Sequence, residues 1–116
     1  EGKLVVAVPR MRLKTRAGIS VVGRVKMDDK ILGYMEKITS YLKFTGGFNV
    51  QFKEDPFGNP KLQEINLRFS GGLDITDAAG VNLPKLVIDI WEGRKVGGFK
   101  VNEGIYVRVP QVYSWK

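Results

Sequence analysis

Glu64, Asn66 and Arg68 place an acid, an amide and a guanidinium at every second position of one short segment. Side chains of a β-strand alternate between its two faces, so these three would project from the same side of a strand. The apolar residues between them would project from the other side. A strand that gathers these three polar groups in one row could hold a metal ion beside a phosphate.

An earlier segment of alternating polar and apolar residues is joined to this strand by turn-rich sequence, which predicts a β-hairpin. A four-residue connection, Pro56–Asn59, would set Gln51 opposite Glu64 and Asn49 opposite Asn66. A connection that is shorter or longer by two residues would keep the same residues on the same face. The prediction that these polar groups share one face therefore holds even if the pairing is shifted by two residues.

Gln51, Glu64 and Asn66 offer only oxygen ligands, which are the ligands that Mg²⁺ or Mn²⁺ prefers. Mg²⁺ usually takes one or two protein groups and completes its shell with water and substrate phosphates. A neighbouring Arg68 would suit a phosphate oxygen. A solvated outer face of a sheet carries the same residue types, so the spacing alone leaves both interpretations open.

Composition limits what else the chain could do. Its 116 residues, 43% hydrophobic and 27% charged, are typical of a globular domain with one core, so we expect residues 1–116 to form a single domain. The absence of Cys and His excludes thiol nucleophiles, the usual zinc sites and imidazole acid–base chemistry. A net charge of +7 favours an anionic partner such as phosphate, nucleotide or nucleic acid.

Hydrophobic periodicity and turn residues predict an α+β fold, with an antiparallel sheet and two main helices. The longer helix follows Asp28 or Asp29 as its N-cap, and the second has Pro84 in its first turn. Strands are expected over residues 3–9, 10–16, 19–25, 49–53, 62–68 and 105–109. The longer helix is expected to have Lys43 in its last turn and to end before Gly46, a short helix is expected over residues 73–79, and the last helix is expected from Leu83 until Gly93.

Cations occupy every second position of the segment 10–16, as Arg10, Arg12, Lys14 and Arg16. If the segment is extended, all four would share one face at intervals of about 6.6 to 6.8 Å. Such a row could attract phosphates. It could equally be an exposed strand whose charges protect a sheet edge from aggregation, because natural sheet edges often carry Lys.

The polar hairpin and the sequence after it resemble a known family. The run 48–52, the Glu-x-Asn-x-Arg pattern of residues 64–68, the following Ser70–Gly72 and the run 79–84 ahead of a helix look like the C-terminal subdomain of an ATP-grasp domain. The sequence is most similar to carbamoyl-phosphate synthase large subunits and related carboxylate-amine ligases. The likeness extends to about Gly93, and it departs at Leu67, where many members carry Pro.

The resemblance implies roles for the residues of the row. Gln51, Glu64 and Asn66 would bind the metals, Mg²⁺ or Mn²⁺, that bridge the phosphates of ATP, and Arg68 would hold phosphate or the acyl-phosphate intermediate. Arg10 and Arg12 would lie near the nucleotide or the acceptor. Ser70–Gly72 could present backbone N–H groups to an anionic substrate, although such a segment on its own is more often just a turn.

The resemblance also implies what this chain lacks. ATP-grasp ligases bind ATP between two subdomains, and the other subdomain supplies a lysine and a mobile glycine-rich loop that this sequence does not contain. We therefore expect a piece of a larger cytoplasmic ligase, inactive alone, which needs the other subdomain in cis or in trans and a small carboxylate or amine substrate. No segment has the length of a membrane helix.

A basic nucleic-acid-binding α+β module is the alternative, supported by the charge and by scattered aromatic residues near the C-terminus. Nucleic acid does not require a row of an acid and amides, whereas Mg²⁺-ATP chemistry does. The hairpin therefore favours the ligase, and nucleic acid is not the expected partner.

Overall fold

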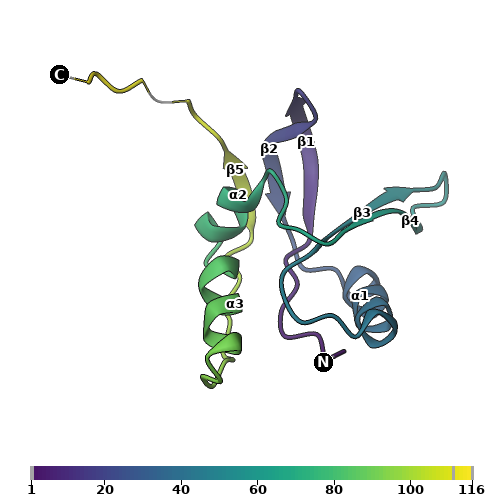
Figure 1. Cartoon of the computed structure of the whole chain (residues 1–116). Helices are drawn as coiled ribbons and strands as arrows, with labels where there is room; N and C mark the ends of the chain where they lie inside the picture. The colour runs from purple at the N-terminus through teal and green to yellow at the C-terminus, as the bar shows by residue number, and fades with distance from the viewer. Residues whose placement is uncertain (1, 111, 116) are drawn as a thin grey trace.

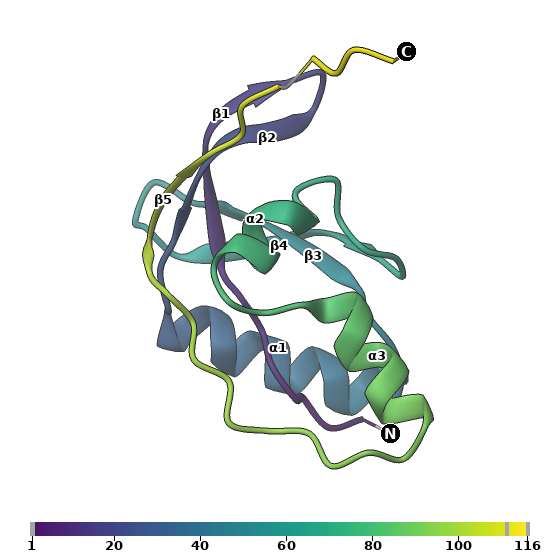
Figure 2. The ribbon, with the colours of Figure 1, turned by 90° about the vertical axis from the view of Figure 1, so that its left-hand side faces the viewer.

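The computed structural model of the chain describes residues 2–110 and 112–115, which form two antiparallel sheets and three helices. The first sheet has the order β1-β2-β5 and the second is the hairpin β3-β4, which runs in a different direction (Figures 1 and 2). The expected α+β fold is confirmed. The elements are β1 (Arg10–Arg16), β2 (Ile19–Val25), α1 (Asp29–Leu42), β3 (Asn49–Glu54), β4 (Pro60–Asn66), α2 (Leu73–Ala78), α3 (Leu83–Trp91) and β5 (Gly104–Val107).

The two longer helices begin at the capping residues that the sequence provides. The side chain of Asp28 accepts a hydrogen bond from the backbone N–H of Ile31 at 3.1 Å, at the start of α1. Asn82 accepts from Lys85 N–H at 3.0 Å, and Pro84 lies in the first turn of α3. Within the described ranges, no helix is both long and apolar enough to cross a membrane.

The core lies where α2 packs on one face of the three-stranded sheet. Ile75 of α2 meets Val25 of β2 and Ala79, and all three are almost fully buried. Gly23 permits this approach, because a Cβ at that position would lie 3.3 Å from the Ile75 side chain. The buried apolar side chains of the described residues are Val25, Ile75, Ala79, Val81 and Leu86.

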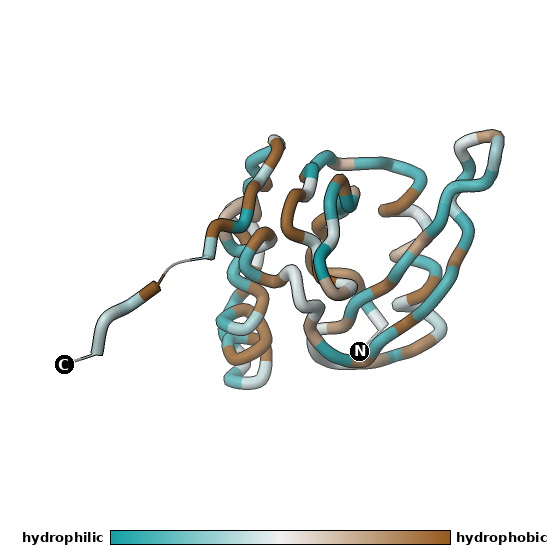
Figure 3. Tube along the Cα trace, turned by 90° about the horizontal axis from the view of Figure 1, so that it is seen from above, coloured by the Kyte–Doolittle hydropathy of each residue, from teal (hydrophilic) through white to brown (hydrophobic). Residues whose placement is uncertain are grey.

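This core is small for a chain of this length, and much apolar surface is left exposed. The accessible surface is 8624 Å², whereas folded monomers of this mass expose about 6,300 Å². Large side chains such as Phe57, Tyr41 and Trp91 are more than two-thirds exposed. Residues 112–115 also project away from the body of the molecule (Figures 1 and 3). The chain therefore offers ample apolar surface to another part of a protein.

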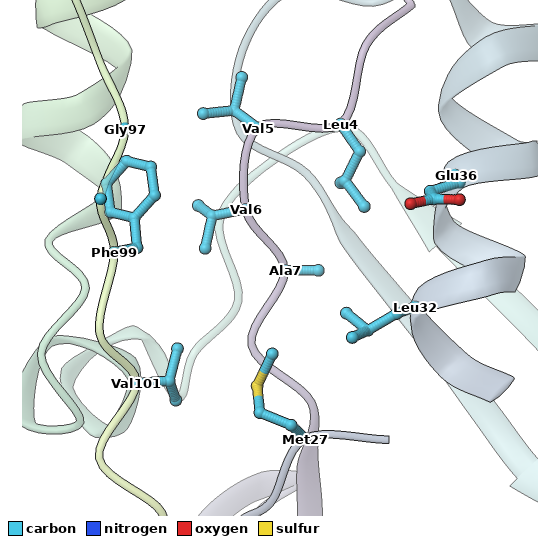
Figure 4. Close-up of a pocket in the computed structure, with 11 residues that line it drawn as sticks. Leu4, Val5, Val6, Ala7, Met27, Leu32, Glu36, Gly97, Phe99 and Val101 are labelled. Atoms are coloured by element: carbon cyan, nitrogen blue, oxygen red, sulfur yellow. The ribbon is translucent and has the colours of Figure 1, made fainter. Parts of the chain in front are cut away.

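The expected strand over residues 3–9 is not present. This segment is extended and β-branched, but no described strand pairs with it, and the first strand begins at Arg10. Leu4–Ala7 instead line a groove of 490 Å³, together with Leu32 and Glu36 of α1 and with Phe99 and Val101 of the segment before β5 (Figure 4). The composition of this segment favours a strand, but a strand in a sheet also needs a neighbouring strand with which to form hydrogen bonds.

The expectation that four cations share one face of β1 is wrong. Arg12 pairs with Gly23, but an irregularity then pairs Lys14 with Val22, the next residue of β2. Because successive residues of β2 face opposite ways, Lys14 leaves the face of Arg12. Arg10 and Arg12 stay together on the face that α2 covers, since they pair with Val25 and Gly23.

We expect Ile75→Ala to lower the free energy of unfolding by about 2 to 4 kcal/mol, because it leaves a cavity in the small core. Ile88→Ala is the matched control, since Ile88 is 55% exposed on α3. Its effect should stay within about 0.5 kcal/mol. Urea unfolding of both variants measures the difference, and equal losses would contradict this account of the core.

Candidate functional site

The hairpin β3-β4 has the pairing that the sequence predicts. Gln51 lies opposite Glu64, and Asn49 lies opposite Asn66, with a regular register between the two pairs. Directly opposed residues of antiparallel strands share a face. The structure therefore brings Gln51, Glu64 and Asn66 to one face and adds Asn49 as a fourth polar member.

The connection between the strands is one residue longer than the four residues expected. It comprises five residues, Asp55–Asn59, between the paired Glu54 and Pro60. The Asp55 carboxylate accepts hydrogen bonds from the backbone N–H groups of Phe57 and Asn59, both at 2.9 Å. The backbone bond from Asn59 is the main cause that lowers the pKa of Asp55. This carboxylate thus holds the turn in one shape.

A bulge in β4 offsets the longer connection. Phe52 pairs with Leu62 while Gln51 pairs with Glu64, so Gln63 is an extra residue on β4. The bulge restores the register that a four-residue connection would have given. It also moves Leu62 to the face of Phe52, away from the row of polar groups.

The row of polar groups faces away from α1. The ring of Phe52 stacks on the ring of Tyr34 in α1, with centroids 6.2 Å apart and planes 27° apart. Gln51 directly precedes Phe52 in β3, so its side chain faces the opposite way. Phe52 on the apolar face of the hairpin contacts α1, and the polar face is left for a ligand or for another part of the protein.

The oxygen ligands on this face fit a divalent ion that is also bound by phosphates. The Glu64 carboxylate is exposed and makes no hydrogen bond or ion pair within the described residues. Gln51 and Asn66 are half-buried, and Asn66 Nδ2 lies buried without a partner. Residues 2–110 and 112–115 contain no cluster of three or more Asp or Glu side chains that could enclose a metal. One carboxylate with two amides matches Mg²⁺ that keeps phosphate and water ligands.

Arg68 is not held in the row by strand pairing. The strand expected over residues 62–68 ends at Asn66. Arg68 lies beyond the ladder, exposed, and its Nη1 donates to the backbone oxygen of Phe69 at 2.9 Å. The position of Arg68 is therefore set by the segment that follows β4.

Arg10 and Arg12 lie in different environments. The guanidinium of Arg10 is half-buried and donates to the backbone oxygen of Gly72 and, at 2.5 Å, to Ser70 Oγ. Burial, and then the positive charge of Arg12, lower the pKa of Arg10. Arg12 is exposed and makes no hydrogen bond or ion pair within the part of the chain described. Arg12 is therefore the more accessible of the two to a ligand.

Arg108 contacts the loop after β4, which the sequence did not reveal. It follows β5, and its Nη2 donates to the backbone oxygen of Gly71 at 2.7 Å and to the carboxylate of Asp74. The hydrogen bond from Arg108 is the main cause that lowers the pKa of Asp74. No local signal marks Arg108, because only the pairing of β5 with β2 brings it to this loop.

We expect the Arg108–Asp74 pair to stabilise the fold only while Asp74 is ionised. The folded-state pKa lies below the unfolded value of about 3.9, so the stabilisation is complete above that pH and is lost as pH falls through the folded pKa. Asp74→Asn should therefore destabilise at about pH 6 and have a diminishing effect below about pH 3.9. Urea midpoints measure this, with Asp77→Asn in the same helix as control. Identical pH profiles for the two variants would contradict the pairing.

Comparison with known proteins identifies the family. Residues 1–112 match the sequence profile described as ATP-grasp in the biosynthetic pathway with Ter operon. A search of curated proteins gives no significant match. The observed α+β fold with antiparallel sheets agrees with an ATP-grasp C-terminal subdomain. The profile covers nearly the whole chain, and the chain therefore belongs to this ATP-grasp family.

Proposed function

We propose that this chain is the metal- and phosphate-binding subdomain of an ATP-dependent ligase that joins a carboxylate to an amine, in the manner of carbamoyl-phosphate synthase. ATP-grasp proteins are in general ATP-dependent ligases, which supports the reaction class. The observation that carries the proposal is the polar face of the hairpin, where Glu64, Gln51 and Asn66 lie on one face and their side chains have no hydrogen-bond partner among the described residues.

Glu64, Gln51 and Asn66 would hold Mg²⁺, or Mn²⁺, against the phosphates of ATP. The bound ion would neutralise negative charge on the phosphates. Glu64 supplies the charge that binds the ion, and the two amide oxygens complete the protein share of its shell. Asn49, on the same face, can donate or accept a hydrogen bond beside them.

Two exposed guanidinium groups are available to the transferred phosphoryl group, Arg68 after β4 and Arg12 on β1. A carboxylate oxygen of the substrate would attack the γ-phosphorus, forming an O–P bond as the bond to the β–γ bridging oxygen breaks and ADP leaves. The amine nitrogen would then attack the acyl carbon and lose a proton while inorganic phosphate departs with the C–O electron pair. Arg68 would stabilise the charge on the phosphoryl oxygens during transfer.

The exposed apolar surface supports a second part of the proposal. Residues 1–116 would act as one subdomain, and the ATP-grasp subdomain that supplies the lysine and the glycine-rich loop would pack against it, in cis or in trans. Use of ATP as a substrate favours a cytoplasmic location. A net charge of +7 also suits nucleic acid, but membership of an ATP-grasp family favours ATP as the anionic partner.

We expect Glu64→Gln in the intact ligase to reduce kcat by about 10²- to 10³-fold, because it removes the charge that binds the metal while keeping the side-chain shape. Stability should change by only about 0.5 kcal/mol, since Glu64 is exposed. Glu54→Gln, an exposed carboxylate of the same hairpin, is the control. ADP formation and its dependence on Mg²⁺ are measured, and normal activity of Glu64→Gln would refute the metal assignment.

We expect the 116-residue chain alone to show no ATP turnover, because its sequence provides neither the lysine nor the glycine-rich loop expected of the other subdomain. ADP release by the purified chain is measured with and without EDTA. Turnover that rises with protein concentration and is abolished by EDTA would show that this chain contains a complete site.

A further inference from the structure

The segment after β4 is held from both edges of the three-stranded sheet. β1 and β5 are the edge strands, in the order β1-β2-β5. Arg10 begins β1 and reaches this segment from one edge, and Arg108 follows β5 and reaches it from the other. The contacts fall on three consecutive residues, Ser70–Gly72.

Arg10 uses both arms of its guanidinium on this segment. Its Nη1 donates to the backbone oxygen of Gly72, and its Nη2 donates to Ser70 Oγ at 2.5 Å. The approach to Gly72 is so close that a Cβ there would overlap Arg10 Nη1. A larger residue at position 72 would therefore require the Arg10 guanidinium to move.

Arg108 holds the residue between these two contacts. Its Nη2 donates to the backbone oxygen of Gly71 at 2.7 Å and also to the Asp74 carboxylate in the first turn of α2. One nitrogen thus links the loop to the helix that packs on the sheet. The two arginines fix the loop against the same sheet and helix that form the core.

The upstream end of the segment is fixed as well. Asn66 makes the last pair of the ladder, with Asn49. The ring of Phe69 packs on Gly47, where a Cβ would overlap it. Arg68 therefore lies in a short span with one end set by strand pairing and the other by Arg10, although it makes no ladder contact itself.

We propose that Arg10 and Arg108 are positioning residues that fix the segment 67–72 and so hold Arg68 beside the Gln51–Glu64–Asn66 face. This inference rests on the proposed function of Arg68 toward the phosphoryl group. It gives Arg10 a role that acts through the protein, whereas the sequence suggested a nucleotide contact. It also gives Arg108, 37 residues from Gly71 along the chain, a part in the site.

A lysine could reproduce the hydrogen bonds of Arg108 but not those of Arg10. Arg10 reaches two acceptors through two different nitrogens, which the single ammonium of lysine cannot reproduce at both positions. Arg108 makes both contacts through one nitrogen, which a lysine ammonium has enough protons to reproduce. The charge-conserving variants Arg10→Lys and Arg108→Lys should therefore behave differently.

The first experiment follows the backbone amide signals of residues 68–70 in the ¹⁵N-labelled chain by NMR. Arg10→Lys should shift these signals and increase the mobility of the segment, whereas Arg108→Lys should leave them close to wild type. Arg24→Lys, at an exposed position of β2 without a side-chain partner among the described residues, is the matched control. Unchanged signals in Arg10→Lys, or equal changes in Arg24→Lys, would overturn the inference.

The second experiment is a double-mutant cycle in the intact ligase, with ADP formation as the readout. Arg10→Lys should lower kcat about 10-fold or more with KM for ATP within about 2-fold, because an interaction made in the transition state is lost. Arg68→Ala with Arg10→Lys should be no slower than Arg68→Ala alone. Additive losses would overturn the positioning role. Normal activity of Arg68→Ala with altered amide signals in Arg10→Lys would instead refute the proposed function of Arg68.

Discussion

The pairing register of β3 with β4 is the constraint on which the candidate site depends. A slip of one residue would turn Gln51 toward α1 and Phe52 toward the polar face, because side chains alternate with a period of two. Two features prevent the slip. The Asp55 carboxylate fixes a five-residue turn, and the extra residue Gln63 restores the alignment of Gln51 with Glu64. The stacking of Phe52 on Tyr34 also favours this register over one shifted by a residue, because a shift would turn the Phe52 ring away from Tyr34 and lose the contact.

Local sequence patterns made the hairpin and its pairing predictable. The features that could not be predicted depend on contacts between residues far apart in the sequence. Alternation and turn residues are encoded within about 20 residues, so the face shared by Gln51, Glu64 and Asn66 follows from sequence. The position of Arg108 does not, because it depends on β5 joining β2. The change of face at Lys14 depends in the same way on irregular pairing with β2. Residues 3–9 have the composition of a strand, but composition cannot say whether a neighbour is present.

Charge is distributed so that the acid of the site stays free although cations are in excess. The chain carries 19 Lys and Arg against 12 Asp and Glu, yet Glu64 forms no ion pair among the described residues. Arg10 and Arg108 are engaged elsewhere, Arg10 by a hydroxyl and a carbonyl and Arg108 by a carbonyl and Asp74. A salt bridge to Glu64 would have to be broken before a metal could bind. Arg10 donates to neutral acceptors, so it uses no carboxylate of the chain.

The small core explains why polar contacts have so large a share in fixing the site. Packing sets side-chain positions most firmly where many apolar groups interlock, and the described residues include only five buried apolar side chains. None of the five belongs to the hairpin β3-β4. The hairpin is therefore held by its ladder, by one ring contact with α1 and by the arginine contacts on the segment after it. Covering the exposed apolar surface would add burial where the chain has little, so binding of another subdomain would make the site more rigid as well as complete.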